Sequence, residues 1–354
     1  MQKSMVYWKA PGAGFMQLLR QGKFILAPAL VGAGRFFMIL NVSGRTDVVQ
    51  FYTDWLLKRF SEGYVLSRNP LFPNKVTRYA LSPDAVDCVV FFSKNYTPIL
   101  PHIRSIADRF NTYFYYTITA YGKDLEPGVP PVSKSVETLI RLSEIVGRER
   151  VAWRYDPVLL TEKYTAQAHL SAFEEMAERL FPHIDRCIFN FVEMYKKVRA
   201  NMPQLIPLTD TDKETLAKGF GRTAEKFGMP VQTCGLCGDF TCYGVQLSGC
   251  ITLDILGGAN HIRFRSLKHK GKRPGCGCIE TRDVGAYDTC MNGCKYCYAN
   301  INPQKAFENY KLHDPDSPLL LGHLKPTDVV QVGNQKSFLA GSSGRHGKNN
   351  FSGS

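Results

Sequence analysis

The sequence lacks an apolar run long enough to cross a membrane, and it carries few acidic residues for its number of basic ones. Its early apolar stretch, Phe24–Val31, is too short to span a bilayer and lacks the residue order of a secretory signal. Acidic residues number 31 against 44 Lys and Arg, so the formal net charge is +13. We therefore expect a cytoplasmic protein with no membrane partner, whose cysteines serve as metal ligands rather than as disulfides.

The sequence also lacks repeated glycine-rich phosphate loops, which argues against a dinucleotide-binding sheet. Short apolar stretches alternate with amphipathic ones instead, a pattern typical of parallel strands joined by helices. The expected strands are 36–42, 89–92, 113–119, 151–155, 187–191 and 230–233, and the expected helices are 48–60, 99–110, 135–146, 166–180 and 212–227. These units predict an α/β fold, a full or partial (β/α) barrel with a C-terminal cysteine-rich cluster-binding segment.

Composition divides the chain into four regions. Residues 1–35 form an N-terminal extension, which belongs to the protein only if Met1 rather than Met38 is the initiator. Residues 36–233 carry the barrel-like pattern, and residues 234–310 form a cysteine-rich iron–sulfur segment that we expect to pack on the barrel. Residues 333–354 are rich in Gly, Ser, Asn and Lys, which predicts a flexible tail.

Polar side chains follow each of the first five expected strands. They are Ser43, Arg45, Thr46 and Asp47; Lys94 and Asn95; Tyr121 and Glu126; Arg154 and Asp156; and Glu193, Tyr195 and Lys196. Because the carboxyl ends of barrel strands meet at one mouth, several of these groups are expected to line a site there. Arg154 and Asp156 are the strongest candidates, since burying either charge alone on an apolar strand end would be costly.

The distribution of the 11 cysteines is more informative than their number. Cys88 and Cys187 stand alone in apolar stretches and are expected to be small core residues. The other nine lie between Cys234 and Cys297. In a chain without a secretory signal, such crowding favours metal or cluster ligation.

Three of these nine form the spacing Cys290-x-x-x-Cys294-x-x-Cys297, with Tyr296 before the last. Three thiolates can hold three corners of a cubane 4Fe–4S cluster and leave one iron open for a ligand, whereas electron-transfer clusters normally use four cysteines. The alternative is a zinc knuckle, in which a C-x-x-C pair is answered by a second pair elsewhere. The complete triplet favours the cluster.

A second set of cysteines lies upstream. Cys234, Cys250, Cys276 and Cys278 are the favoured ligands of a closed four-cysteine site, either a second 4Fe–4S cluster or zinc. Cys237 and Cys242 lie in a Gly-rich insert and are interpreted as additional. Sequence alone does not fix which four of the six belong together.

The densest basic stretch, His261–Arg273, contains six Lys and Arg and no acid. It is either a phosphate-binding surface for nucleic acid or a solvated loop beside a negatively charged cluster. Phe264 is its single aromatic residue, so base stacking has little support, and the solvated loop is the favoured interpretation.

The cysteine triplet with Tyr296 is similar to the cluster loop of radical S-adenosylmethionine (SAM) enzymes. From about residue 38 to residue 300 the chain also resembles a bacterial family known as a domain of unknown function, with radical-SAM-like cysteines at its C-terminal end. The matching segments are 43–47, 69–70, 91–95, 117–122, 125–127, 153–157 and 276–299. Two features depart from the superfamily: the cluster loop follows nearly the whole chain, and the usual glycine-rich SAM-amine motif is not found after it.

This resemblance implies that SAM chelates the open iron and that an electron from the cluster splits SAM into methionine and a 5′-deoxyadenosyl radical. It also implies a reductant such as flavodoxin or ferredoxin. Expected SAM or substrate contacts are Arg45, Asp47, Lys94, Glu126, Arg154 and Asp156, with Tyr296 beside the cluster. The Tyr296–Tyr298 segment further resembles the cluster loop of spore photoproduct lyase, which makes nucleic acid a candidate substrate.

We therefore expect a radical SAM enzyme. Two alternatives remain open: a zinc-binding, nucleic-acid-binding protein without catalysis, and an iron–sulfur electron carrier. A large concave barrel argues against the carrier, because electron transfer does not need one.

Overall fold

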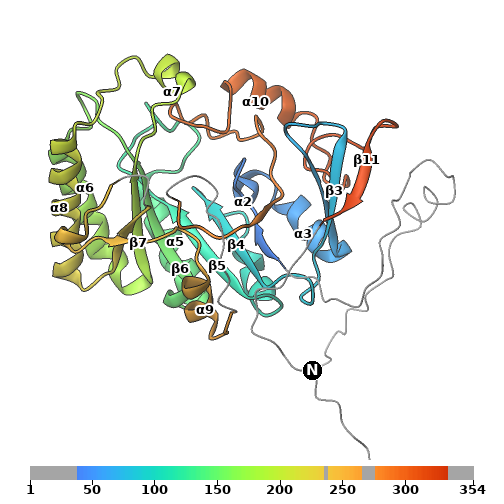
Figure 1. Ribbon diagram of the computed structural model, residues 1–354, viewed down its shortest axis with the longest axis horizontal. Helices are drawn as coiled ribbons and strands as arrows, with labels where there is room; N and C mark the ends of the chain where they lie inside the picture. Colours follow the sequence, from blue (N-terminus) through green and yellow to red (C-terminus); the bar gives the residue numbers. More distant parts are fainter. Residues whose placement is uncertain (1–37, 235–237, 265–275, 334–354) are drawn as a thin grey trace, which may run out of the picture.

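A computed structural model describes residues 38–234, 238–264 and 276–333 (Figure 1). The predicted extension at 1–35, all but the first residue of the tail at 333–354, and most of the basic stretch His261–Arg273 lie outside the described residues. Within these ranges, no helix combines the length and the apolar character that crossing a bilayer requires.

The fold is built on a parallel sheet, which has eight strands within the described residues, in the order β10-β1-β4-β5-β6-β7-β8-β9. Their bounds are β10 (Arg282–Asp283), β1 (Ile39–Asn41), β4 (Cys88–Ser93), β5 (Thr112–Thr117), β6 (Val151–Val158), β7 (Arg186–Phe191), β8 (Val231–Thr233) and β9 (Gln246–Leu247). Each neighbouring pair is parallel. The predicted α/β class is confirmed.

The sheet follows chain order from β1 to β9, and β10 adds on the other side of β1. In the described part of the chain no ladder joins β9 to β10, so a closed form of the predicted barrel is not observed. Both edge strands are two residues long, and both residues of β9 are exposed. Such short edges offer few groups for further pairing.

Helices connect the strands. In the described residues they are α2 (Val48–Phe51), α3 (Thr53–Glu62), α4 (Ile103–Ala107), α5 (Val132–Val146), α6 (Ala166–Leu180), α7 (Lys196–Asn201), α8 (Asp210–Phe227), α9 (Leu253–Asn260) and α10 (Pro303–Tyr310). Every expected strand and helix overlaps an observed one. The helix expected at 48–60 is divided at Tyr52, whose backbone leaves helical geometry at φ −135° and whose hydroxyl donates to the Thr289 carbonyl at 2.6 Å.

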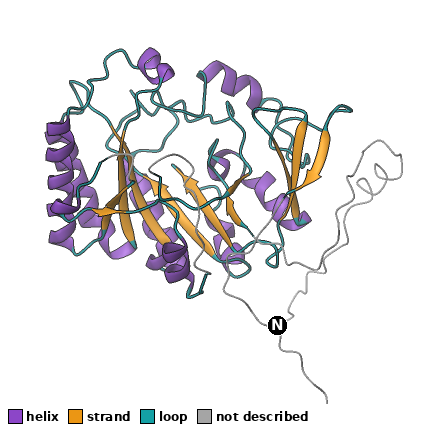
Figure 2. Ribbon diagram, in the orientation of Figure 1, coloured by secondary structure: helices purple, strands orange, loops and turns teal. Residues whose placement is uncertain are grey.

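The two faces of the sheet bury different residues, because side chains alternate along each strand. Val89 and Phe91 of β4 pack into a large core that α3, α5, α6 and α8 cover. Cys88 and Val90 point to the other face, where residues of α9 complete a smaller core. Figure 2 shows α6 and α8 on the opposite side of the strands from α9. Cys88 and Cys187 are both fully buried, as predicted.

A second, smaller sheet was not predicted. Its order is β11-β3-β2, formed by β2 (Tyr64–Arg68), β3 (Lys75–Ala80) and β11 (Val329–Val332). Arg68 donates to both carboxylate oxygens of Asp328, at 2.6 and 2.7 Å. The strand that follows the cysteine-rich segment is thereby attached to the strands that follow α3.

The sequence predicts Thr211, three residues before Glu214, as the N-cap of α8 and Gly228 as its end, but the N-cap prediction was wrong by two residues. Thr209 rather than Thr211 is the N-cap: its hydroxyl accepts from the Asp212 amide, and the Asp212 carboxylate accepts from the Thr209 amide at 2.9 Å. Both pairings place a small polar residue three before an acid, so the spacing alone does not choose between them. Gly228 ends the helix in the left-handed region at φ 61°, as expected.

Thr209→Ala should lower the free energy of unfolding by about 1 kcal/mol, because the amides of the first helical turn lose their acceptor. Urea denaturation followed by circular dichroism measures the change. Thr211→Ala is the matched control, since Thr211 is exposed within the first turn and should have little effect. Equal losses in the two variants would contradict the assignment.

Candidate functional site

The loop that carries Cys290, Cys294 and Cys297 is fixed by backbone contacts to the segment between β5 and α5. The Gly128 amide donates to the Asn292 carbonyl at 2.8 Å, and the Lys295 amide donates to the Leu125 carbonyl at 3.0 Å. A Cβ on Gly128 would stand 2.7 Å from the Asn292 Cα, so only glycine fits this approach. The loop is therefore placed at the carboxyl ends of the strands.

The three thiols of this loop interact with one another. Burial, reinforced by the nearby Asp47 and Cys297, raises the pKa of Cys290 to about 12. Burial also raises the pKa of Cys294 well above its usual value, although Lys94 acts in the opposite direction. The Ala299 amide donates to the Cys297 Sγ at 3.3 Å. Cys290 and Cys294 are therefore protonated at neutral pH unless a metal displaces the protons, as coordination to a metal does.

A buried ion pair stands beside the loop. Lys94 Nζ, after β4, lies 2.9 Å from Glu126 Oε1, and the side chains are 13% and 3% exposed. The same carboxylate oxygen accepts from Thr119 Oγ1 at 2.8 Å and from the Tyr296 hydroxyl. Burial alone would lower the pKa of Lys94, but Glu126, Cys294 and more distant acids raise it above its ordinary value. Three predicted site residues thus meet at one point.

Asp47 joins this group from the N-terminus of α2. Its carboxylate accepts from Ser93 Oγ at 2.8 Å, from the Lys94 amide at 2.9 Å, and from Asn292 Nδ2 at 3.4 Å. Burial raises the pKa of Asp47 to about 6, partly offset by hydrogen bonds from the Lys94 amide and Ser93. The carboxylate therefore connects the end of β4 to the cysteine loop.

Arg154 and Asp156, both on β6, form an ion pair with each other. Asn190 of β7 donates to Asp156 Oδ2 at 3.1 Å, and the Arg154 guanidinium lies 5.2 Å from the centre of the Phe92 ring. Burial lowers the pKa of Arg154, but Asp156 and Cys250 together with the tyrosines nearby raise it above its usual value. Asp156 also acts electrostatically on Lys94, as Cys250 does on Arg154.

Arg45 lies apart from these groups. Its Nε is 3.1 Å from Asp283 Oδ1, and its Nη2 donates to Ser67 Oγ at 3.0 Å and to the Asp283 carbonyl at 2.9 Å. These contacts tie the loop after β1 to β10 and β2. In the structure Arg45 connects β1, β2 and β10 through these contacts. Its contact with SAM stays a prediction.

The residues that follow β7 also lie outside the group formed by Asp47, Lys94, Glu126 and Tyr296. Glu193 and Tyr195 bond to each other just before α7. Ser93, Thr119, Asn190 and Asn292 belong to the site but were missed. Ser93, Thr119 and Asn190 stand at or beside the ends of expected strands, the same signal that selected Lys94, whereas Asn292 carries no signal beyond being polar.

The structure also brings together the four favoured upstream cysteines. The Cys250 thiol shares hydrogen bonds with Cys234 and Cys278, and Cys276 with Cys278. Cys242 is exposed, and Cys237 lies outside the described residues. Among the residues that are described, no three His, Cys, Asp or Glu side chains already stand where they could hold one metal ion.

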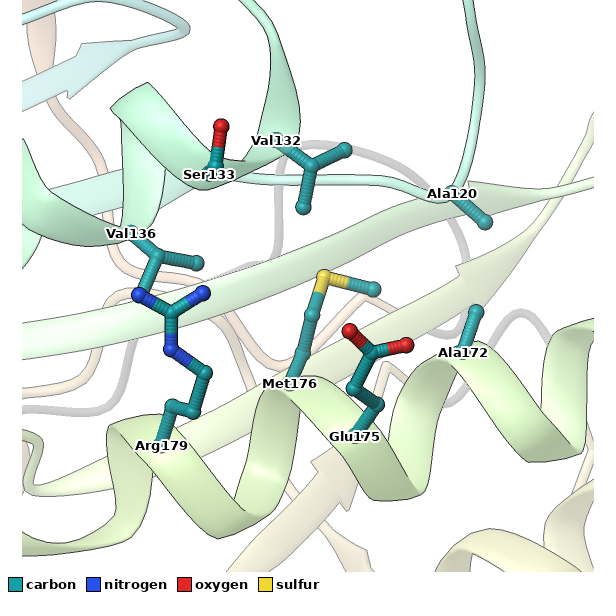
Figure 3. A pocket seen from close by; sticks show the side chains of 8 residues that line it. All are labelled: Ala120, Val132, Ser133, Val136, Ala172, Glu175, Met176 and Arg179. Atoms are coloured by element: carbon teal, nitrogen blue, oxygen red, sulfur yellow. The ribbon is translucent and has the colours of Figure 1, made fainter.

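Among the described residues, one cavity lies beside the cysteine loop and another between two helices. One, of about 170 Å³, borders the cysteine loop and is lined by Cys294, Cys297, Lys295, Asn300 and their neighbours. The other, of about 260 Å³, lies between α5 and α6, where Val132 and Met176 point into the space and Glu175 and Arg179 flank it (Figure 3). None of the predicted site residues lines this second cavity.

The fold and the site define an α/β protein with a cysteine-bearing loop over the carboxyl ends of a parallel sheet. The chain belongs to the family described as "Domain of unknown function (DUF1848)", which matches residues 39–299. No curated protein matches the sequence. Among solved structures, a "putative alpha-L-fucosidase" from Bacteroides thetaiotaomicron VPI-5482 is 11% identical and covers 81% of this chain and 97% of its own. Its TM-score is 0.25, and a likeness at that level supports no argument about fold or activity.

Proposed function

We propose that this protein is a radical SAM enzyme of the cytoplasm, which binds a 4Fe–4S cluster through Cys290, Cys294 and Cys297. The observation that carries the proposal is the placement of these thiols on one fixed loop beside the buried Lys94–Glu126 pair. In this proposal the open sheet is a partial barrel, and the carboxyl ends of its strands form the substrate site.

The donor set fits a cluster better than a single ion. Each cysteine of a cubane binds a different iron, so the three sulfurs need not surround one point. Lys94 supplies positive charge beside Cys294, where thiolate ligands would add negative charge. Two buried amide oxygens on or just after this loop, Asn292 Oδ1 and Asn300 Oδ1, have no hydrogen-bond partner.

A cluster with an open iron supplies an electron that cleaves bound SAM. The residues of this chain would bind and orient the reactants. Glu126, paired with Lys94, anchors the cysteine loop through Tyr296, and Asp47 fixes the loop through Asn292. Arg154 has a buried Nε without a hydrogen-bond partner, which is available to a carboxylate such as that of SAM. A flavodoxin or ferredoxin would act as reductant.

The substrate is open, and nucleic acid is a candidate because of the local similarity to spore photoproduct lyase. The zinc-binding and electron-carrier alternatives predict different properties. A zinc protein would be colourless and would contain no sulfide. A carrier would need neither the ion pairs Lys94–Glu126 and Arg154–Asp156 nor an open iron.

Anaerobically prepared protein should be brown and contain iron and acid-labile sulfide. Replacing Cys290, Cys294 and Cys297 together by Ala should remove one cluster's worth of both, because no ligand of that centre remains. Iron and sulfide assays with visible absorption measure the loss. Cys242→Ala is the matched control, since this thiol is exposed and outside both sets. Stoichiometric zinc without sulfide after anaerobic reconstitution would reject the cluster.

A further inference from the structure

A second group of thiols lies on segments of the chain other than the Cys290–Cys297 loop. Cys234 follows β8, Cys250 precedes α9, and Cys276 and Cys278 precede β10. The Cys250 amide donates to Cys278 Sγ at 3.1 Å, and the Cys278 amide donates to Cys276 Sγ at 3.5 Å. Three separate segments of the chain thus bring these four cysteines close to one another.

Two glycines let the segments meet. A Cβ on Gly249 would stand 2.4 Å from the Gly277 carbonyl carbon, and one on Gly277 would stand 3.0 Å from the Gly249 amide nitrogen. A side chain at either position would force the backbones of the two segments apart. Nearby, the Ile279 amide donates to the Ile251 carbonyl at 2.9 Å, and both side chains are buried in the smaller core. This hydrogen bond and the burial of both side chains fix Ile251 and Ile279, which directly follow Cys250 and Cys278.

Hydrogen-bond donors and a cation lie beside these sulfurs. Arg154 acts on Cys250 from β6. Asn190 Oδ1 accepts from the Cys234 amide at 3.2 Å and so links this group to the Arg154–Asp156 pair. Four thiols, amide donors and a cation are the surroundings that a thiolate metal centre uses.

We propose that Cys234, Cys250, Cys276 and Cys278 form a second, closed thiolate metal centre that holds Zn²⁺ or a 4Fe–4S cluster. Four cysteines fill every ligand position of either centre, so this site would stabilise the fold or relay electrons rather than bind substrate. Loading replaces the hydrogen bonds between the thiols by metal–sulfur bonds and releases the thiol protons. The proposal does not rest on the proposed radical SAM activity.

The full chain with Cys290, Cys294 and Cys297 replaced by Ala isolates this centre, because the replacement touches none of its ligands. After anaerobic preparation it should retain either zinc without sulfide, or iron and sulfide in equal amounts. Adding Cys250→Ala and Cys278→Ala should remove that metal, and adding Cys242→Ala should not. Elemental analysis and a sulfide assay distinguish the two centres. Equal metal with and without Cys250 and Cys278 would overturn the proposal.

Alkylation of the unaltered protein provides a second test that does not depend on the folding of variants. Cys276 is only partly buried. With metal bound, iodoacetamide should label exposed Cys242 quickly and leave Cys276 protected by at least tenfold in rate. Removing the metal with a chelator should abolish this protection, as read by peptide mass spectrometry. Labelling of Cys276 at the same rate with and without metal would overturn the proposal, as would a Cys250–Cys278 disulfide in the metal-bearing protein.

A failure of the proposed function would look different. If the first loop binds no cluster, the triple replacement leaves the metal content unchanged, and the remaining metal still depends on Cys250 and Cys278. If the second centre is absent, the triple replacement removes all metal.

Discussion

Reduced protein with its cluster loaded is expected to release 5′-deoxyadenosine from SAM, slowly alone and faster when the substrate is present. The open iron would bind the amino-acid end of SAM beside the strand ends that carry Lys94 and Arg154. Liquid chromatography of the quenched reaction measures the nucleoside. The variant without Cys290, Cys294 and Cys297 should release none, because it has no cluster to supply the electron.

Arg154→Ala tests the positioning of SAM in the same assay. It should lower the rate of 5′-deoxyadenosine release on the order of a hundredfold, since a misplaced reactant loses most of the benefit of binding. Iron content at Cys290, Cys294 and Cys297 should not change, because Arg154 is not a ligand. Arg179→Ala is the matched control: this arginine is exposed on α6, beside the cavity between α5 and α6.

Two outcomes would contradict the proposed activity. One is the absence of 5′-deoxyadenosine from a fully loaded, reduced cluster. The other is an electron paramagnetic resonance spectrum of the reduced cluster that SAM does not change. Either would leave an iron–sulfur protein whose open iron serves another ligand. Unchanged turnover in Arg154→Ala would instead remove Arg154 from the site and keep the chemistry.

The sequence predicted the positions of the six strands from β1 to β8 in the large sheet well, because the strands of a parallel sheet are buried on both faces. The run Thr112–Thr117 is entirely buried, and its aromatic and β-branched residues are unlike those of the amphipathic helices around it. Because the strands are parallel, the polar residues just after such runs lie at the same edge of the sheet. For that reason Lys94 and Glu126 could be predicted as neighbours in space, although 31 residues stand between them.

Other features depend on contacts that no local pattern records. The β2-β3-β11 sheet pairs strands from opposite ends of the chain, and its strands are short and partly exposed. The closeness of Gly249 and Gly277 appears only when two distant loops are placed together. Arg45 follows a strand as Lys94 does, yet Asp283 on the neighbouring β10 takes up its donors. The position of a polar residue just after a strand predicts that it lies at the carboxyl edge of the sheet. It does not predict which residue it pairs with.

The buried Lys94–Glu126 pair should have a large effect on stability when it is broken from one side. Lys94→Met leaves the Glu126 carboxylate buried without its cation, which should cost about 3–5 kcal/mol in the free energy of unfolding. The double variant Lys94→Met/Glu126→Gln should cost less than the sum of the single variants. The glutamine side chain that replaces Glu126 is neutral, and its amide oxygen can still accept from Thr119 Oγ1 and the Tyr296 hydroxyl.

Urea denaturation of all variants in one anaerobic, metal-free buffer gives the coupling energy of the pair, with ligation kept out of the comparison. The exposed pair Lys134–Glu137 on α5 is the matched control, at 3.2 Å with both side chains 56% exposed. Solvent screening limits its coupling to at most about 1 kcal/mol. If Lys94→Met costs no more than Lys134→Met, the Lys94–Glu126 pair does not hold Tyr296 and the cysteine loop in place. The cluster site would then depend on Asp47 and on the backbone contacts of Gly128 and Lys295 alone.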